Sequence, residues 1–117
     1  MIKSEETTRE RNILDVVDYR GERVIFTEKK WKEKSIQHPE LTNSKFLKNL
    51  KRAIESPQIV WQDYDDPVKK ACYYWRHKIN QYIKVVIWTF ENPCRVVSAF
   101  ETNYIKEAKY PNLEQLK

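Results

Sequence analysis

The chain has 117 residues, of which 40% are hydrophobic and 33% charged, and it carries a net charge of +5. This length supports one hydrophobic core, so we expect a single α+β domain over residues 13–117 that follows a flexible, charged arm at residues 1–12. The only glycine, Gly21, argues against a phosphate-binding loop or a dinucleotide-binding turn, because both need several glycines.

The first half of the sequence predicts a hairpin and two helices. Residues 13–26 are typical of strand, turn and strand, because apolar β-branched runs flank the glycine. Thr27 is a suitable N-cap for a helix that ends before Pro39, since the residue preceding a proline is disfavoured in the α region. A second helix is expected to begin after Thr42 or Asn43, because apolar residues then recur at helical spacing.

Beyond residue 57 the hydrophobic period changes to two, which indicates strands. Strands are predicted at residues 58–61, 72–76, 82–90 and 95–100, while residues 104–109 fit either a short last strand or a helical turn. Short turns between consecutive strands favour antiparallel pairing. We therefore predict an α+β fold in which an N-terminal hairpin and helices pack on one face of a roughly four-stranded antiparallel sheet.

We expect a cytoplasmic protein. The N-terminal residues are polar, unlike a secretory signal, and no apolar run approaches the roughly 20 residues of a membrane helix. Cys72 and Cys94 should then be reduced thiols that pack as small hydrophobic side chains. Since both fall on neighbouring predicted strands, a disulfide between them is the alternative.

Positive charge is concentrated in the helical region. Residues 23–56 contain nine basic and four acidic side chains. Such a patch suits a phosphate-bearing partner such as RNA, because each neutralised phosphate releases counterions. A lysine-rich helix face that is simply solvated is the alternative.

The two histidines are candidate proton carriers. His38 lies between the predicted helices beside the basic stretch, with Glu40 two residues away, and an imidazole titrates near neutrality. A surface histidine in a turn is the alternative for His38, and we expect His77 at the surface because cations flank it. The histidines are too far apart for a zinc signature, and the acidic run at residues 63–66 is typical of a turn, since it lacks the glycine and distal glutamate of a calcium loop.

The late strands supply candidate phosphate contacts. Lys84 interrupts an apolar strand and should face solvent or a bound anion, because an unpaired buried ammonium is costly. Pairing with Glu101 is the alternative. Arg95 is the better phosphate clamp, because its planar guanidinium can bind two oxygens at once. Further candidate contacts are Ser98, Thr102 and, by stacking, Tyr74.

Several short motifs occur together in a fixed order. They are Thr27-Glu28-Lys29-Lys30-Trp31, His38-Pro39-Glu40, Tyr73-Tyr74, the strand at residues 82–87, and Arg95-Val96-Val97-Ser98-Ala99-Phe100 leading to Ile105-Lys106. This order, over about residues 13–109, resembles the phage-barnase-type branch of a ribonuclease superfamily that unites barnase, EndoU, colicin D and RelE-like toxins. The chain departs from the family pattern at Gln37, where a basic residue is common, and at Ser98, where threonine is more usual.

The resemblance implies helices packed on a four-stranded antiparallel sheet, and RNA cleavage that needs no metal or other cofactor. It implies catalytic roles for His38, Glu40, Arg95 and Ser98, and substrate-binding roles for Lys84, Tyr74, Thr102 and Lys106. The reaction would be attack of a 2′-hydroxyl on the adjacent phosphate. A toxin of this kind would have RNA and a cognate antitoxin or immunity protein as partners, with no membrane and no small-molecule cofactor. The alternative is a non-catalytic RNA-binding or protein-interaction module.

Overall fold

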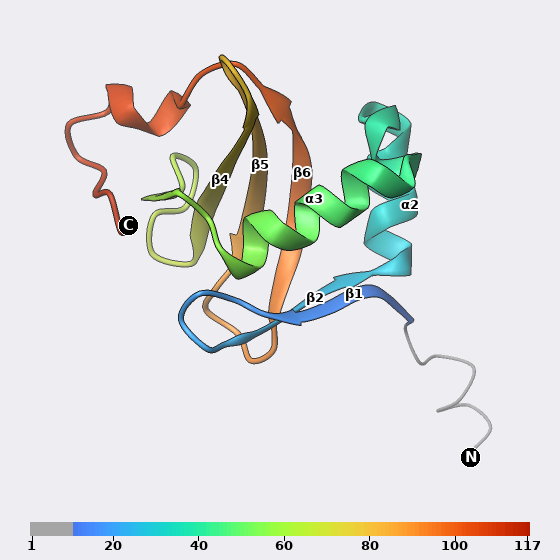
Figure 1. Cartoon of the computed structure of the whole chain (residues 1–117). Helices are drawn as coiled ribbons and strands as arrows, with labels where there is room; N and C mark the ends of the chain where they lie inside the picture. Colours follow the sequence, from blue (N-terminus) through green and yellow to red (C-terminus); the bar gives the residue numbers. More distant parts are fainter. Residues whose placement is uncertain (1–10) are drawn as a thin grey trace.

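Strands supply most of the regular structure in the computed structural model, which describes residues 11–117 (Figure 1). The strands are β1 (Asn12–Val17), β2 (Arg23–Thr27), β3 (Ile59–Gln62), β4 (Lys70–Lys78), β5 (Gln81–Trp88) and β6 (Cys94–Thr102). The helices are α2 (Glu28–Gln37) and α3 (Ser44–Glu55), with short 3-10 turns η1 (Pro39–Thr42) and η2 (Lys106–Lys109). The predicted flexible arm at residues 1–12 lies outside the described residues except for its last two, of which Asn12 begins β1.

The six described strands form one mixed sheet in the order β1-β2-β6-β5-β4-β3. The α+β class is confirmed, but the prediction of a roughly four-stranded antiparallel sheet is wrong. The N-terminal hairpin adds two strands to the sheet beside β6. Its strand β2 pairs in parallel with β6 through Val24–Cys94 and Ile25–Arg95. The other neighbouring pairs are antiparallel. The spacing of hydrophobic residues predicts where strands lie in the sequence, but not which strands are neighbours in the sheet. It therefore does not predict a pairing between segments 70 residues apart.

Local capping chemistry fixes where the helices begin. The Thr27 hydroxyl accepts a hydrogen bond from the backbone N–H of Lys30 (3.2 Å), which confirms Thr27 as the N-cap of α2. Asn43 is the N-cap of α3, because its Oδ1 accepts from the backbone N–H groups of Lys45 (2.8 Å) and Phe46 (3.2 Å). These bonds satisfy N–H groups that have no partner within the helix. Thr42, the other predicted cap, ends η1 instead.

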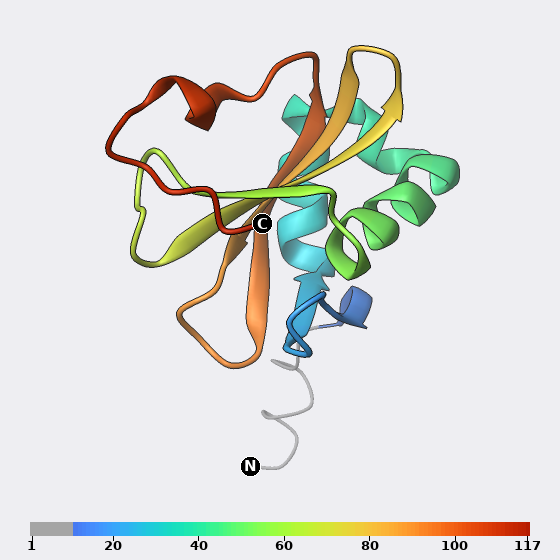
Figure 2. The same cartoon turned by 60° about the vertical axis from the view of Figure 1, so that its left-hand side comes forward.

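The core lies between α3 and the face of the sheet that α3 crosses (Figures 1 and 2). The helix contributes apolar residues at helical spacing, and the central strands contribute alternate residues. Buried members of this core include Leu50, Ala53, Ile54, Tyr73, Ile83, Val85, Ile87 and Ala99. By contrast, α2 buries none of its own residues and runs beside β2 and β6.

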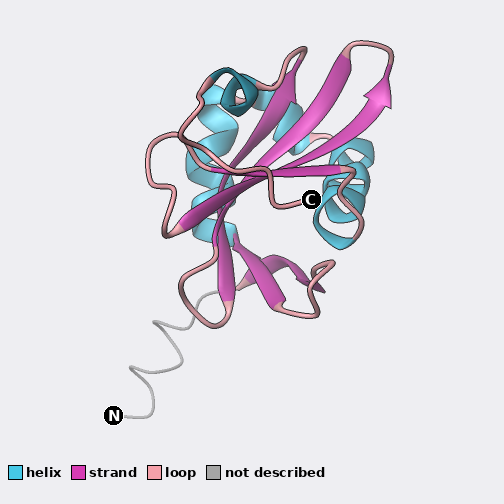
Figure 3. Ribbon diagram, turned by 90° about the vertical axis from the view of Figure 1, so that its left-hand side faces the viewer, coloured by secondary structure: helices cyan, strands magenta, loops and turns pink. Residues whose placement is uncertain are grey.

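The C-terminal segment covers the opposite face of the sheet (Figures 2 and 3). Residues 104–109, for which the sequence allows a strand or a helical turn, contain the turn η2. The chain then returns along β3, where the backbone N–H of Gln62 donates to the carbonyl of Glu114 (3.0 Å). Because of this cover, Tyr74 and Lys84 are buried although neither belongs to the core beneath α3.

Two further observations bear on the sequence predictions. Cys72 and Cys94 are both free and buried. They lie on β4 and β6, which are separated by β5, rather than on neighbouring strands. Within residues 11–117, neither helix is long and apolar enough to cross a membrane.

Candidate functional site

A groove of about 240 Å³ lies where the N-terminal end of α3 meets the ends of β4 and β6. Its polar lining residues are Glu40 (η1), Asn43 (the N-cap of α3), Lys45 and Asn49 (α3), His77 and Lys78 (β4), and Glu101 (β6). We call it the His77 groove. It brings together an imidazole, two carboxylates and two lysines on the helix-covered side of the sheet.

A β-bulge places the histidine in this groove. The register between β4 and β5 shifts between Arg76 and Lys78, so His77 is the extra residue of the bulge. Bulges commonly re-aim a side chain, and here the imidazole reaches past β5 to the next strand. His77 Nε2 lies 2.8 Å from Glu101 Oε2, an ion-pair contact that is not aligned as an in-line hydrogen bond. The Trp75 ring stacks beside the imidazole, with centroids 6.4 Å apart and planes 17° apart.

Glu40 supplies the second carboxylate of the groove. Its Oε2 accepts a hydrogen bond from the backbone N–H of Glu101 (3.3 Å). The indole N–H of Trp31 donates to the carbonyl of Leu41 (2.8 Å), which ties η1 to α2. These two bonds fix η1 between a helix and the end of β6, and within residues 11–117 no hydrogen-bond donor meets Glu40 Oε1.

Lys45 and Lys78 provide positive charge on either side of the groove. Neither forms an ion pair with a carboxylate among the described residues. Lys45 lies in the first turn of α3, where the helix dipole adds partial positive charge. An anion such as a phosphodiester therefore has two available ammonium groups within this groove.

His38 lies next to the groove but is not part of its lining. Its backbone N–H ends α2 by donating to the carbonyl of Lys34 (2.9 Å), and its half-buried ring stacks on Phe100 at a centroid distance of 4.9 Å. Of the eight residues predicted for the site, the structure thus brings only His38 and Glu40 to this groove, while Tyr74 and Lys84 meet elsewhere.

Three of the predicted residues lie on the opposite face of the sheet. Lys84 is only 6% exposed, and its Nζ lies 2.8 Å from Glu107 Oε2 in η2. The ammonium therefore faces neither solvent nor Glu101, which pairs with His77 instead. The Tyr74 hydroxyl donates to the other oxygen of Glu107. Lys106 is placed over the ring of Tyr64, with its Nζ 4.7 Å from the ring centroid.

Burial removes two groups on this face from acid-base chemistry near neutral pH. Burial and then the hydrogen bond to Glu107 raise the pKa of the Tyr74 hydroxyl well above its usual range. Burial likewise raises the pKa of the Cys72 thiol, so the free thiol stays protonated. Neither group is a proton carrier or a nucleophile at cellular pH.

The remaining predicted residues are spread along β6. Arg95 is aligned with Ile25 and Trp88 near the start of the strand, six residues from Glu101, which is roughly 20 Å along an extended chain. Its Nε lies 3.7 Å from Glu91 Oε1. Ser98 is half-buried opposite Val86 in the middle of the strand. Thr102 ends the strand, and its hydroxyl donates to the carbonyl of Tyr104 (3.4 Å).

Sequence reasoning missed the residue at the centre of the groove. His77 was expected at the surface because Arg76 and Lys78 flank it, but its side chain is 13% exposed. The signal was the period of the strand: Tyr73, Trp75 and His77 alternate, and Tyr73 belongs to the core. A strand that buries Tyr73 beneath a helix directs the histidine to the same side.

No protein family, curated protein or solved structure matches this chain. The chemistry of the groove is therefore argued from its own side chains. It offers an imidazole held beside one carboxylate, a second carboxylate, and two ammonium groups, which is a set suited to proton transfer at a bound anion.

Proposed function

We propose that this protein is a ribonuclease that cleaves RNA by attack of a 2′-hydroxyl on the adjacent phosphate, and that the His77 groove is its active site. The observation that carries the proposal is the 2.8 Å contact between His77 and Glu101, inside a groove whose two lysines form no ion pair within residues 11–117. The reaction needs a base for the 2′-hydroxyl, an acid for the leaving 5′-oxygen, and positive charge on the phosphate. The groove supplies each of these without a metal ion.

The geometry favours one division of roles. Glu40, whose Oε2 is already bonded to a backbone N–H, uses Oε1 to take the proton from the 2′-hydroxyl. The 2′-oxygen then attacks phosphorus, and the bond from phosphorus to the 5′-oxygen breaks. The His77 imidazolium gives its proton to the departing 5′-oxygen, and the products are a 2′,3′-cyclic phosphate and a 5′-hydroxyl.

The other groove residues assist this transfer. Glu101 acts as a positioning residue, because its carboxylate lies beside the imidazolium and stabilises its charge. Lys45 and Lys78 stabilise the negative charge that grows on the phosphate oxygens. The uneven alignment of His77 with Glu101 is compatible with this role, since catalytic hydrogen bonds are often poorly aligned before substrate binds.

The test uses the purified full chain and a labelled RNA oligonucleotide at neutral pH with EDTA present. We expect cleavage products that end in a 2′,3′-cyclic phosphate, detected by mass spectrometry. His77→Ala should reduce the cleavage rate by about 10²–10⁴-fold. His38→Ala is the matched control, because His38 lies beside the groove without lining it. Absence of cleavage by the wild-type chain, or cleavage that survives His77→Ala and depends on His38, would overturn the assignment.

A second candidate function is RNA binding without cleavage. The observation that favours it is the solvent-facing side of α3, where Lys48, Lys51 and Arg52 are all exposed. A binding module would retain the RNA in a gel-shift assay and leave it intact at high protein concentration. An oligonucleotide with 2′-deoxy sugars lacks the attacking hydroxyl, so it would bind to a module or an enzyme without being cleaved. Ordinary RNA would give cleavage products only if the protein is an enzyme.

The resemblance to toxin-type ribonucleases supports a cytoplasmic toxin with a cognate inhibitor as partner. Such an inhibitor would present acidic side chains to Lys45 and Lys78, because opposite charges attract across an interface and basic side chains would be repelled by the two lysines. A pull-down from native lysate should recover an acidic protein that blocks cleavage. Recovery of RNA alone would count against this partner.

A further inference from the structure

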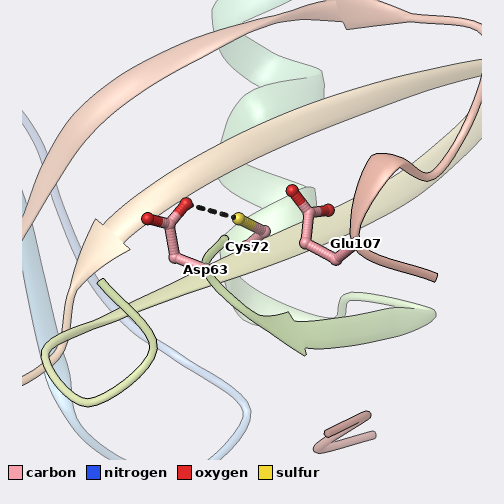
Figure 4. A group of neighbouring side chains, drawn as sticks. All are labelled: Asp63, Cys72 and Glu107. Carbon is pink, nitrogen blue, oxygen red and sulfur yellow. Dashed lines mark hydrogen bonds between the residues drawn. The ribbon is translucent and has the colours of Figure 1, made fainter. Parts of the chain in front are cut away.

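A buried cluster of two carboxylates and a thiol lies on the sheet face away from the His77 groove. It consists of Asp63, directly after β3, Cys72 on β4 and Glu107 in η2 (Figure 4). One ligand atom from each lies within 4.8 Å of the other two, and the three residues are 7%, 0% and 1% exposed. Figure 4 shows the sulfur of Cys72 between the two carboxylates.

Bonds from outside the cluster hold both carboxylates in place. Asp63 Oδ2 accepts from the backbone N–H groups of Asp65 and Asp66 (3.0 Å each), so that Oδ1 is left to meet the thiol of Cys72 at 3.3 Å. Glu107 is bonded through one oxygen to Tyr74 and through the other to Lys84. Outer partners of this kind orient the ligands of a metal ion.

The charges of this buried region do not balance. Two carboxylates, Asp63 and Glu107, face a single ammonium, that of Lys84, which is 6% exposed. Burying a charge without a partner is costly, and a cation in the cluster would remove the excess. A divalent ion that also displaced the thiol proton of Cys72 would bring the four side chains and the ion to zero net charge.

We propose that Asp63 Oδ1, Cys72 Sγ and one oxygen of Glu107 bind a Zn²⁺ ion that fastens the C-terminal segment to the sheet. One sulfur and two oxygens suit zinc, whereas calcium and magnesium prefer oxygen ligands alone. On binding, the S–H bond of Cys72 breaks, a Zn–S bond forms, and the proton passes to solvent. A water molecule completes the four-coordinate site.

This site is independent of the proposed catalysis. The cluster and the His77 groove lie on opposite faces of the sheet, so the ion would act on stability rather than on RNA cleavage. The two proposals are therefore tested separately: failure of the zinc site leaves the ribonuclease proposal intact, and absence of RNA cleavage leaves the zinc proposal intact.

The test titrates Co²⁺, a spectroscopic substitute for zinc, into the purified full chain under reducing conditions. We expect one equivalent to bind and to produce the near-ultraviolet charge-transfer band of a cobalt–thiolate bond. Cys72→Ser should abolish this band, while Cys94→Ser, the matched control, should retain it. Added Zn²⁺ should displace the cobalt, bleach the band and raise the thermal unfolding temperature of the wild-type chain.

The outcomes separate cleanly. The proposal is overturned if the wild-type chain gives no cobalt–thiolate band, or if the band follows Cys94 rather than Cys72. If Cys72→Ser does not fold, as judged by circular dichroism, Asp63→Asn takes its place, and it should weaken cobalt binding by at least about tenfold. Unchanged affinity in Asp63→Asn would also overturn the proposal.

Discussion

The hydroxyl of Tyr73 donates a 2.7 Å hydrogen bond to Oδ2 of Asp18, whose side chain is fully buried. Tyr73 lies on β4, and Asp18 begins the turn of the N-terminal hairpin. The same carboxylate accepts from the Arg20 side chain and, through Oδ1, from the backbone N–H groups of Arg20 and Glu22. One buried carboxylate therefore shapes the hairpin turn and fastens it to β4, which lies four strands away from β1 in the sheet.

Asp18→Asn should lower the free energy of unfolding by about 2–3 kcal/mol, because hydrogen bonds to a buried charge are lost or inverted. The measurement is urea denaturation followed by circular dichroism. Asp15→Asn is the control, since Asp15 forms an exposed ion pair with Arg23 (2.8 Å) and should cost less than about 1 kcal/mol. Equal losses in the two variants would contradict the anchoring role of Asp18.

The same carboxylate should contribute to the acid sensitivity of the fold. Burial alone would raise the pKa of Asp18, but hydrogen bonds from Tyr73, the Glu22 N–H and Arg20 outweigh it, so the pKa is lowered from its ordinary value of 3.8. A lowered pKa stabilises the fold above 3.8, and that contribution is lost as the pH falls through the native value. The measurement is the urea concentration at the midpoint of unfolding, taken at several pH values between 7 and 2. Below pH 4 this midpoint should fall less steeply in Asp18→Asn than in the wild-type chain. Parallel curves would refute the prediction.

Glu101→Gln should lower kcat for RNA cleavage by about 10- to 100-fold with little change in KM. The amide keeps the shape of the side chain but removes the carboxylate charge that orients the His77 imidazolium toward the departing 5′-oxygen. Steady-state kinetics on a short RNA measures both constants. An increase in KM alone would show that Glu101 contacts the substrate instead of positioning the imidazole.

Lys78→Ala should weaken RNA binding and reduce its salt dependence. Each lost phosphate contact lowers the slope of log affinity against log salt concentration by about 0.7 for single strands. Fluorescence anisotropy with a non-cleavable RNA, at several salt concentrations, gives the slope. Lys69→Ala is the control, because Lys69 is an exposed lysine in the loop between β3 and β4, outside the groove. An unchanged slope in Lys78→Ala would remove this lysine from the interface.

Trp31→Phe should destabilise the fold by about 1 kcal/mol and reduce RNA cleavage as well. The substitution keeps an aromatic ring but removes the N–H that donates to the carbonyl of Leu41 (2.8 Å). Because Leu41 follows Glu40 in η1, a looser η1 displaces the proposed base. A variant that loses stability but cleaves at the wild-type rate would show that this bond does not position Glu40.

The parts of the fold that depend on neighbouring residues were predictable from the sequence. Thr27 and Asn43 cap their helices as expected, because an N-cap bond spans only two or three residues. The hairpin turn at Gly21 also follows from a local requirement, since its φ of +88° is accessible chiefly to glycine.

The parts that depend on distant contacts were not predictable. The parallel pairing of Val24 with Cys94 added the hairpin to the sheet, and hydrophobic period carries no information about it. Lys84 was expected to face solvent or a bound anion, and its actual partner, Glu107, comes 23 positions later, where the sequence allows either a strand or a helical turn. The bulge at His77 likewise depends on the register of β4 against β5, although the alternation from Tyr73 already indicates the side that His77 faces.

The return of the C-terminal segment along β3 has a consequence for self-association. The backbone groups of Val60 and Gln62 on the outer side of β3 are already bonded to residues 114–117, so this border of the sheet offers few free donors and acceptors to another molecule. In the described part of the chain, β1 is then the border left open to cross-strand pairing between molecules, and Asp15 places a charge on it. Charged side chains on such a border discourage aggregation.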